Sequence, residues 1–71
     1  MITETSEFFH PLMTKFGFKL VESFPDEDFK HHLYSNNTIS ILVTDSIFGS
    51  YWQQGDKFGS WAILEEHLNT L

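Results

Sequence analysis

Residues 29–44, FKHHLYSNNTISILVT, contain the clearest strand signal in the chain. The second part of this stretch, Thr38–Thr44, is β-branched at five of its seven positions, and β-branched side chains favour a pleated strand. The pair Asn36-Asn37 precedes it, and asparagine tolerates the positive φ that a two-residue hairpin turn requires. Phe29–Ser35 is therefore predicted to be the preceding strand of an antiparallel hairpin.

Two further strands are predicted on either side of this hairpin. Phe18–Phe24 alternates in side-chain character and is followed by Pro25-Asp26-Glu27-Asp28, in which proline suits the second position of a turn. On the other side, Asp45-Ser46 is predicted to be a turn that leads into a fourth strand, Ile47–Gln53. Strands joined by such short turns form an antiparallel meander.

Two features of the predicted strands leave alternatives open. Gly49 indicates a bulge or a close backbone approach in the fourth strand, and Gln54–Lys57 is predicted to be a loop. If Phe29–Tyr34 belongs to the preceding loop, the meander has three strands rather than four.

A helix is predicted at each end of the chain. Thr3–Phe16 places its apolar residues on one side, and Gly17 suits the left-handed cap that ends a helix. Pro11 leaves the start of this helix open, because proline inside a helix removes a hydrogen bond and produces a kink. At the other end, Ser60 is expected to be an N-cap. It is followed by an apolar stripe at helical spacing, formed by Trp61, Leu64, Leu68 and Leu71.

These elements predict one α+β domain over residues 1–71. The expected architecture is an antiparallel meander of three to four strands, with the N-terminal and the C-terminal helix packed on one face. Ile39, Ile41 and Val43 share one face of the third strand, and Leu42 points to the other. Tyr51 and Trp52 also point to opposite faces, so a large aromatic side chain is expected on the uncovered side.

Composition excludes several classes of function. The 71 residues include four lysines, no arginine, ten acidic residues and no cysteine, for a formal net charge of −6. The lysines are scattered, so we expect neither nucleic-acid binding nor attraction to an anionic membrane surface. The absence of cysteine excludes a disulfide framework and thiol catalysis, and it fits a cytoplasmic location.

No set of residues predicts a cofactor, a metal site or catalysis. His31 and His32 are adjacent in a predicted strand and should point to opposite faces, so they cannot share a metal ion. No serine lies in a nucleophile motif, and the glycines do not have the spacing of a phosphate-binding loop. We therefore expect a binding protein rather than an enzyme.

The preferred hypothesis is a protein-binding module that covers a basic surface of a protein partner. In size, acidity and helix–meander–helix order, the chain is similar to many small bacterial immunity proteins and phage-encoded inhibitors. This resemblance implies that it inhibits its partner stoichiometrically. Acidic residues would steer the partner and aromatic residues would anchor it. The predicted partner-binding residues are Glu22, Asp26, Glu27, Asp28, Tyr34, Tyr51 and Trp52. The alternative is a homodimer that uses the same aromatic residues.

Overall fold

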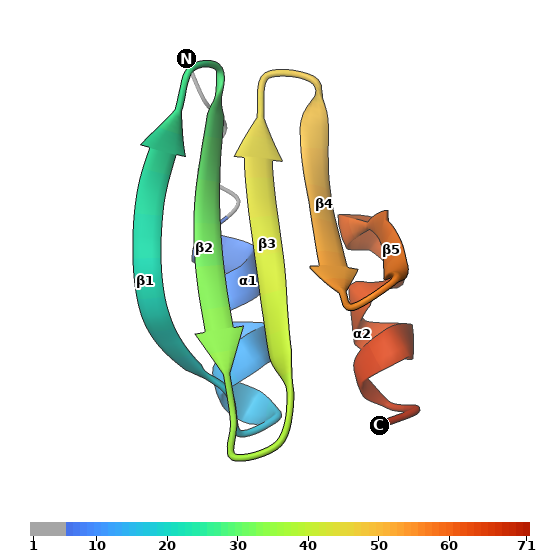
Figure 1. Cartoon of the computed structure of the whole chain (residues 1–71). Coiled ribbons are helices and arrows are strands. Elements are labelled where there is room, and N and C mark those ends of the chain that lie inside the picture. Colours follow the sequence, from blue (N-terminus) through green and yellow to red (C-terminus); the bar gives the residue numbers. More distant parts are fainter. Residues whose placement is uncertain (1–5) are drawn as a thin grey trace.

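The computed structural model describes residues 6–71, and the side chains from residue 9 onward (Figure 1). The described chain starts with a helix, continues through five strands and ends in a short helix. Its elements are α1 (Ser6–Lys15), β1 (Lys19–Asp26), β2 (Phe29–Ser35), β3 (Ser40–Ser46), β4 (Gly49–Gln54), β5 (Lys57–Ser60), the 3-10 turn η1 (Trp61–Ile63) and α2 (Leu64–Leu68).

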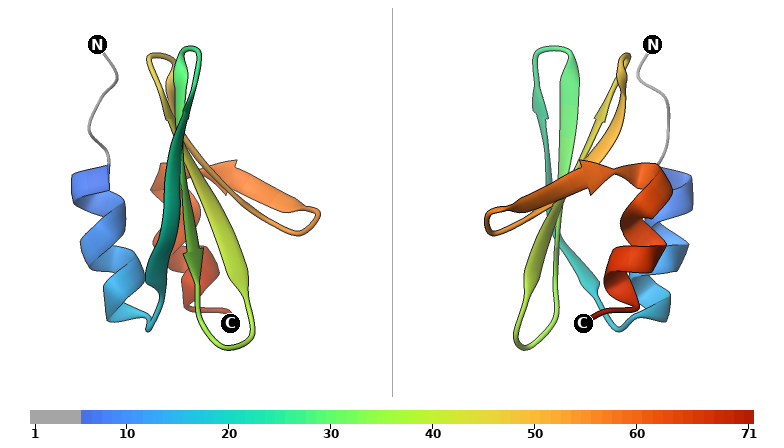
Figure 2. Two further views of the ribbon diagram at one scale, coloured as in Figure 1. Left: turned by 60° about the vertical axis from the view of Figure 1, so that its left-hand side comes forward. Right: turned by 90° about the vertical axis from the view of Figure 1, so that its right-hand side faces the viewer.

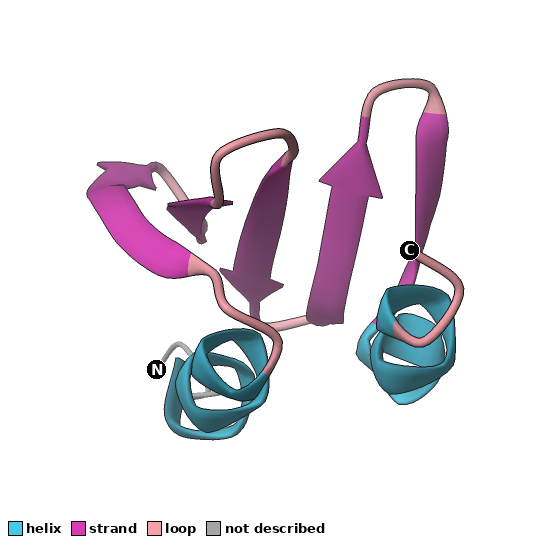
Figure 3. Cartoon of the chain, turned by 90° about the horizontal axis from the view of Figure 1, so that it is seen from below, coloured by secondary structure: helices cyan, strands magenta, loops and turns pink. Residues whose placement is uncertain are grey.

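The strands form one antiparallel sheet in chain order, β1-β2-β3-β4-β5. Both helices lie on the same side of this sheet, as the end-on view in Figure 3 shows. Figure 2 shows that β4 and β5 turn away from the direction of β1 and β2, so the sheet is strongly twisted. The predicted α+β meander with terminal helices is therefore confirmed.

The predicted number of strands is too low, because the residues assigned to a loop form a hairpin. Gln54 pairs with Lys57 across the two-residue turn Gly55-Asp56, and Gly55 has a φ of +60° that suits such a turn. Pairing then continues to Ser60, which has extended backbone and makes no side-chain cap hydrogen bond. Ser60 is thus both the last residue of β5 and the N-cap residue of η1, and it lacks only the side-chain hydrogen bond of a serine cap.

One turn lies later in the chain than predicted. Asp45 and Ser46 belong to β3, and the turn falls at residues 47–48. Both side chains are buried, and the Ser46 hydroxyl donates a hydrogen bond to the Gly49 carbonyl 2.9 Å away. Asp45 and Ser46, whose residue types are typical of a turn, thus form their hydrogen bonds inside the sheet.

The first strand forms one edge of the sheet and is irregular. Its register with β2 shifts between Leu20 and Glu22, which leaves Val21 as the extra residue, so the bulge lies here rather than at Gly49. Pro25 is part of this strand rather than of a turn, and an edge strand tolerates its missing N–H. All eight residues of β1 are exposed.

The two helices differ in part from the prediction. Pro11 lies inside α1, and residues 3–5 of the predicted helix lie outside the described residues. Gly17 has a φ of +85° and its N–H donates to the Thr14 carbonyl, so the predicted left-handed cap is confirmed. The C-terminal helix begins later than predicted, and Trp61 is 55% exposed, so it does not belong to the buried stripe.

A single apolar core lies between the sheet and the two helices. Ile41 and Val43 point into it and Leu42 does not, so the predicted alternation is confirmed, and the structure adds which of the two faces is covered. Phe9 and Met13 come from α1, and Leu64 and Leu68 from α2. The remaining core residues are Phe18, Tyr34 and Trp52. Because this core occupies one face of the sheet, the opposite face remains uncovered by any described element.

Candidate functional site

The uncovered side of the sheet, called the open face below, carries two rows of side chains that run across the strands. Directly paired residues of antiparallel strands point to the same side, so the register defines each row. The first row is Phe24, His31, Thr44 and Tyr51, and the second is Glu22, Leu33, Leu42, Gln53 and Phe58. Phe24 is 37% exposed, Tyr51 45% and Phe58 79%, so large aromatic surface reaches solvent here.

An imidazole organises the β1–β2 end of this face. His31 Nδ1 lies 2.8 Å from Thr44 Oγ1, and His31 Nε2 lies 3.5 Å from Asp26 Oδ2. The ring stacks on Phe29, with centroids 6.3 Å apart, and contacts Phe24 at 5.0 Å. Contacts at both ring nitrogens and with two neighbouring rings hold these aromatic groups in place, so a partner meets a surface that is already ordered.

Carboxylates border the same end of the open face. Glu22 and Asp26 flank Phe24 at two-residue spacing on β1, and Glu27 and Asp28 form the turn to β2. Lys30 and Lys57 are in register with residues on the helix side of the sheet, and Lys15 is on α1. Lys19 pairs with Ser35, at the opposite end of the same hairpin. The β1–β2 turn is thus an acidic corner beside an aromatic surface.

The structure brings five of the seven predicted binding residues together. Glu22, Asp26, Glu27 and Asp28 share the β1–β2 corner, and Tyr51 lies on the same face two strands away. These residues fit the predicted combination of steering charges and an aromatic anchor.

The other two predicted residues, Tyr34 and Trp52, lie in the core on the helix side, with 1% and 4% exposure. The Tyr34 hydroxyl is 3.2 Å from His10 Nδ1, and burial, followed by the nearby Asp45 carboxylate, raises the pKa of Tyr34. The Trp52 indole N–H donates to the Ser60 carbonyl at 3.0 Å. Neither side chain can anchor a partner in this fold, because both are covered by the helices and η1.

Two exposed aromatic residues in the rows of the open face, Phe24 and Phe58, are absent from the predicted binding residues. Phe24 lies two residues after Glu22 in the same strand and therefore points to the same face, so its place on the open face could have been predicted. Phe58 could not, because residues 57–60 carry no strand signal and pair with β4 only through the Gly55-Asp56 turn.

A chain of polar side chains, buried except for Ser23, crosses the helix side of the sheet. Ser23 Oγ lies 2.9 Å from His32 Nδ1, His32 Nε2 lies 3.1 Å from Asp45 Oδ2, and the Ser50 hydroxyl donates to Asp45 Oδ1 at 3.0 Å. These four side chains come from β1, β2, β3 and β4 in turn. His32 is 4% exposed and Asp45 1%, so the chain satisfies polar groups that burial would otherwise destabilise.

This polar chain resembles a catalytic triad in composition only. Both ring nitrogens of His32 are already bonded, and the serine lies at Nδ1 while the carboxylate lies at Nε2. We interpret it as a structural link across four strands. The expected separation of His31 and His32 is confirmed, since they point to opposite faces. Among residues 6–71 no group of three His, Cys, Asp or Glu side chains could hold a metal ion.

Comparisons of the chain with protein-family models, with curated proteins and with solved structures gave no match. In the described part of the chain, neither helix has the length and apolar character needed to cross a membrane. The role of the open face has therefore to be inferred from its own geometry and charge.

Proposed function

We propose that this chain is a small acidic protein-binding module, of the stoichiometric inhibitor or immunity type, that covers a basic surface of a protein partner. The observation that carries the proposal is the acidic corner formed by Glu22, Asp26, Glu27 and Asp28 directly beside the ordered aromatic surface of the open face. The module acts by binding rather than by catalysis, and we expect it to meet its partner in the cytoplasm.

The aromatic part of the open face supplies the contact energy. Exposed aromatic side chains on an ordered surface are the groups that most often anchor protein interfaces. Phe24, Tyr51 and Phe58 are spread over β1, β4 and β5, so a partner that contacts all three covers the width of the sheet.

The acidic corner selects the charge of the partner. A net charge of −6 with its carboxylates gathered at one corner attracts a positively charged surface and accelerates its arrival. The same charge works against a second copy of the chain, since each copy adds six negative charges to the complex. A basic protein partner is therefore favoured over the homodimer, which remains the competing outcome of the test.

The test is affinity capture from a lysate of the source organism, at low and at high salt, with three matched baits. The first bait is the unaltered chain. The second carries Glu27→Gln and Asp28→Asn at the corner. The third carries Asp56→Asn and Glu66→Gln. These changes also remove two negative charges, but at positions away from the acidic corner.

We expect one near-stoichiometric basic protein that is lost at high salt, is depleted with the corner variant and is retained with the third bait. A Tyr51→Ser bait should also lose it, whereas Leu71→Ser, which alters another exposed apolar residue, should not. Capture that is the same with all five baits, or recovery of only untagged copies of the chain itself, would contradict the proposal.

A further inference from the structure

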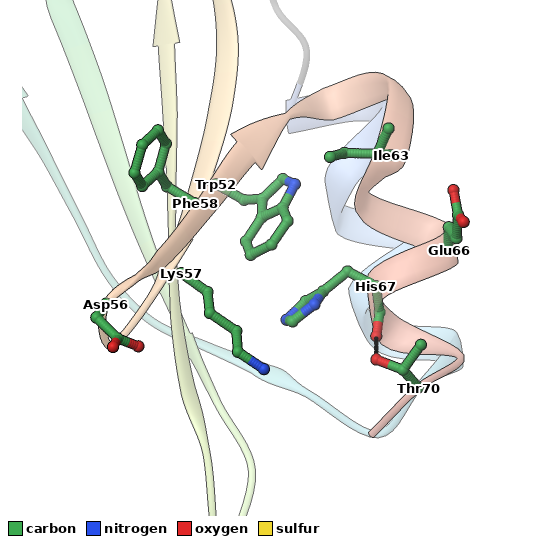
Figure 4. A pocket seen from close by; sticks show the side chains of 8 residues that line it. All are labelled: Trp52, Asp56, Lys57, Phe58, Ile63, Glu66, His67 and Thr70. Atoms are coloured by element: carbon green, nitrogen blue, oxygen red, sulfur yellow. Dashed lines mark hydrogen bonds between the residues drawn. The ribbon is translucent and has the colours of Figure 1, made fainter.

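A second surface feature lies on the helix side of the sheet, away from the open face. It is a groove of about 530 Å³ between α2 and the β4–β5 hairpin. Figure 4 shows Trp52 and Lys57 on one wall, and Ile63, His67 and Thr70 on the other. Clefts of roughly 300–1,000 Å³ are the usual size of sites for small molecules. The groove is thus large enough for a molecule of one or two rings.

Two stacked rings form the inner part of the groove, and the Trp52 indole is only 4% exposed. The His67 ring stacks on the Trp52 indole with centroids 4.1 Å apart and an angle of 18° between the planes. The indole is held from behind by its hydrogen bond to the Ser60 carbonyl, and Ile63, 45% exposed, forms the opposite wall. The indole lies beneath the His67 ring, so a ligand in the groove meets His67 and Ile63 rather than Trp52. An exposed ring beside an aliphatic side chain favours a planar apolar ligand.

The groove contains one positive charge. Lys57 is exposed, forms no ion pair within residues 6–71, and extends toward the His67 ring (Figure 4). The carboxylates of Asp56 and Glu66, which also border the groove, point away from it. The Lys57 ammonium is therefore the charged group that a ligand in the groove would meet.

His67 does not add a second charge at neutral pH. Burial, followed by the positive charge of Lys57, lowers the pKa of His67 below its ordinary value of 6.5. Its Nε2 is hydrogen-bonded to Gln54 Oε1 in the neutral ring. Beyond Lys57 and His67 a second, more polar hollow of about 440 Å³ continues toward Ile39, so the ammonium stands between an apolar and a polar compartment.

We propose that this groove is a binding site for a small, flat, apolar molecule that carries one negative charge, such as an aryl carboxylate. The ring lies against His67 and Ile63, and the carboxylate accepts a hydrogen bond from the Lys57 ammonium. Phe58 borders both this groove and the open face, but the lysine and the rings of the groove lie outside that face. The proposal therefore does not depend on the function proposed for the open face.

The test is an NMR titration of the full chain with 1-naphthoate and with its uncharged analogue 1-naphthamide. We expect saturable shifts at Lys57, Ile63, His67 and the Trp52 indole N–H. Because a charge-assisted hydrogen bond contributes about a factor of ten to affinity, naphthamide should bind roughly tenfold more weakly than naphthoate. The variant Lys57→Gln should weaken naphthoate binding by about the same factor.

Two control variants show whether the charge of Lys57 itself is responsible for the affinity. Lys57→Arg retains the charge and should retain most of the affinity, and Lys19→Gln removes a charge from β1 and should leave the affinity unchanged. Equal binding of the acid and the amide, an affinity unaffected by Lys57→Gln, shifts centred on the open face instead, or the absence of saturable binding would each overturn the proposal.

Discussion

Gly59→Ala should destabilise the fold, because β5 passes very close to the Trp52 indole. A Cβ added at Gly59 would lie 2.7 Å from Ile63 Cδ1 and 2.9 Å from Trp52 Cζ2. Ordinary carbon–carbon contacts are about 3.5–4.0 Å, so the overlap is roughly 1 Å on two sides. The Ile63 side chain is half exposed and can rotate, but the indole is fixed by its Ser60 hydrogen bond and by the His67 ring.

We expect a loss of about 1–3 kcal/mol in the free energy of unfolding, the usual cost of forcing extra volume into a packed site. For a domain of this size each 1 kcal/mol lowers Tm by roughly 4–8 °C. Urea unfolding followed by circular dichroism measures the loss. The Trp52 indole N–H signal reports whether the ring has moved.

Two further variants separate overpacking from a backbone effect. Gly55→Ala has open space around its Cβ but a φ of +60°, so it should cost about 1 kcal/mol through backbone strain and leave the Trp52 signal in place. Adding Ile63→Ala to Gly59→Ala removes one of the two clashing groups, and the pair should be less destabilising than the sum of the single changes. Strict additivity, or an unmoved indole signal in Gly59→Ala, would refute the reasoning.

Three other outcomes follow from polar groups on the helix side of the sheet, of which Asp45 and Tyr34 are buried and His67 is partly exposed. Asp45→Ala leaves the His32 and Ser50 donors without their acceptor and should cost about 2–4 kcal/mol in urea unfolding, whereas the exposed Asp56→Ala should change stability by less than about 0.5 kcal/mol. The pKa of His67 is lowered in the folded state, so the unfolded chain binds more protons, and stability is lost as the pH falls below about 6.5. His67→Gln should reduce that slope in a pH series of unfolding free energies, and an unchanged slope would show that another group causes it. The pKa of Tyr34 is raised, so the folded state keeps its proton longer, and stability is lost as the pH rises above 10.0. Tyr34→Phe should flatten that alkaline loss, and an ultraviolet titration in which Tyr34 ionises no later than the exposed Tyr51 would contradict the assignment.

The parts of the fold that could be predicted are those with a local signal. Side-chain alternation separated Ile41 and Val43 from Leu42 without deciding which face is covered, and β2 has the predicted bounds of Phe29–Ser35. Gly17 ended the first helix as expected. These features depend on spacing and backbone conformation within a few residues, which the sequence displays directly.

The parts that could not be predicted depend on contacts between distant residues. The fifth strand exists because Lys57–Ser60 pairs with β4, although its four residues have no alternation of their own to reveal it. Asp45 and Ser46 were predicted to form a turn, because the sequence does not show the buried hydrogen-bond partners that these side chains have in the structure. Tyr34 was expected outside because no sequence pattern shows that His10, on α1, receives its hydroxyl.

The candidate sites also differ in whether a local sequence signal predicts them. The acidic corner is local and was found from Asp26-Glu27-Asp28 alone. The groove joins residues of β4, β5 and α2, and it forms only after the unpredicted hairpin brings Lys57 beside His67.

The irregular edge strand has a consequence for how this chain behaves in a crowded solution. A protein that shows aromatic side chains on an uncovered sheet is at risk of growing into fibrils, in which strands of neighbouring molecules add to a free edge one after another. In β1 the extra residue Val21 breaks the hydrogen-bond ladder, and Pro25 offers no N–H to an incoming strand. The carboxylates of Glu22 and Asp26 repel the edge of a like molecule. The sheet can therefore expose an aromatic surface to another protein, while β1 prevents further strands from adding to this edge and forming a polymer.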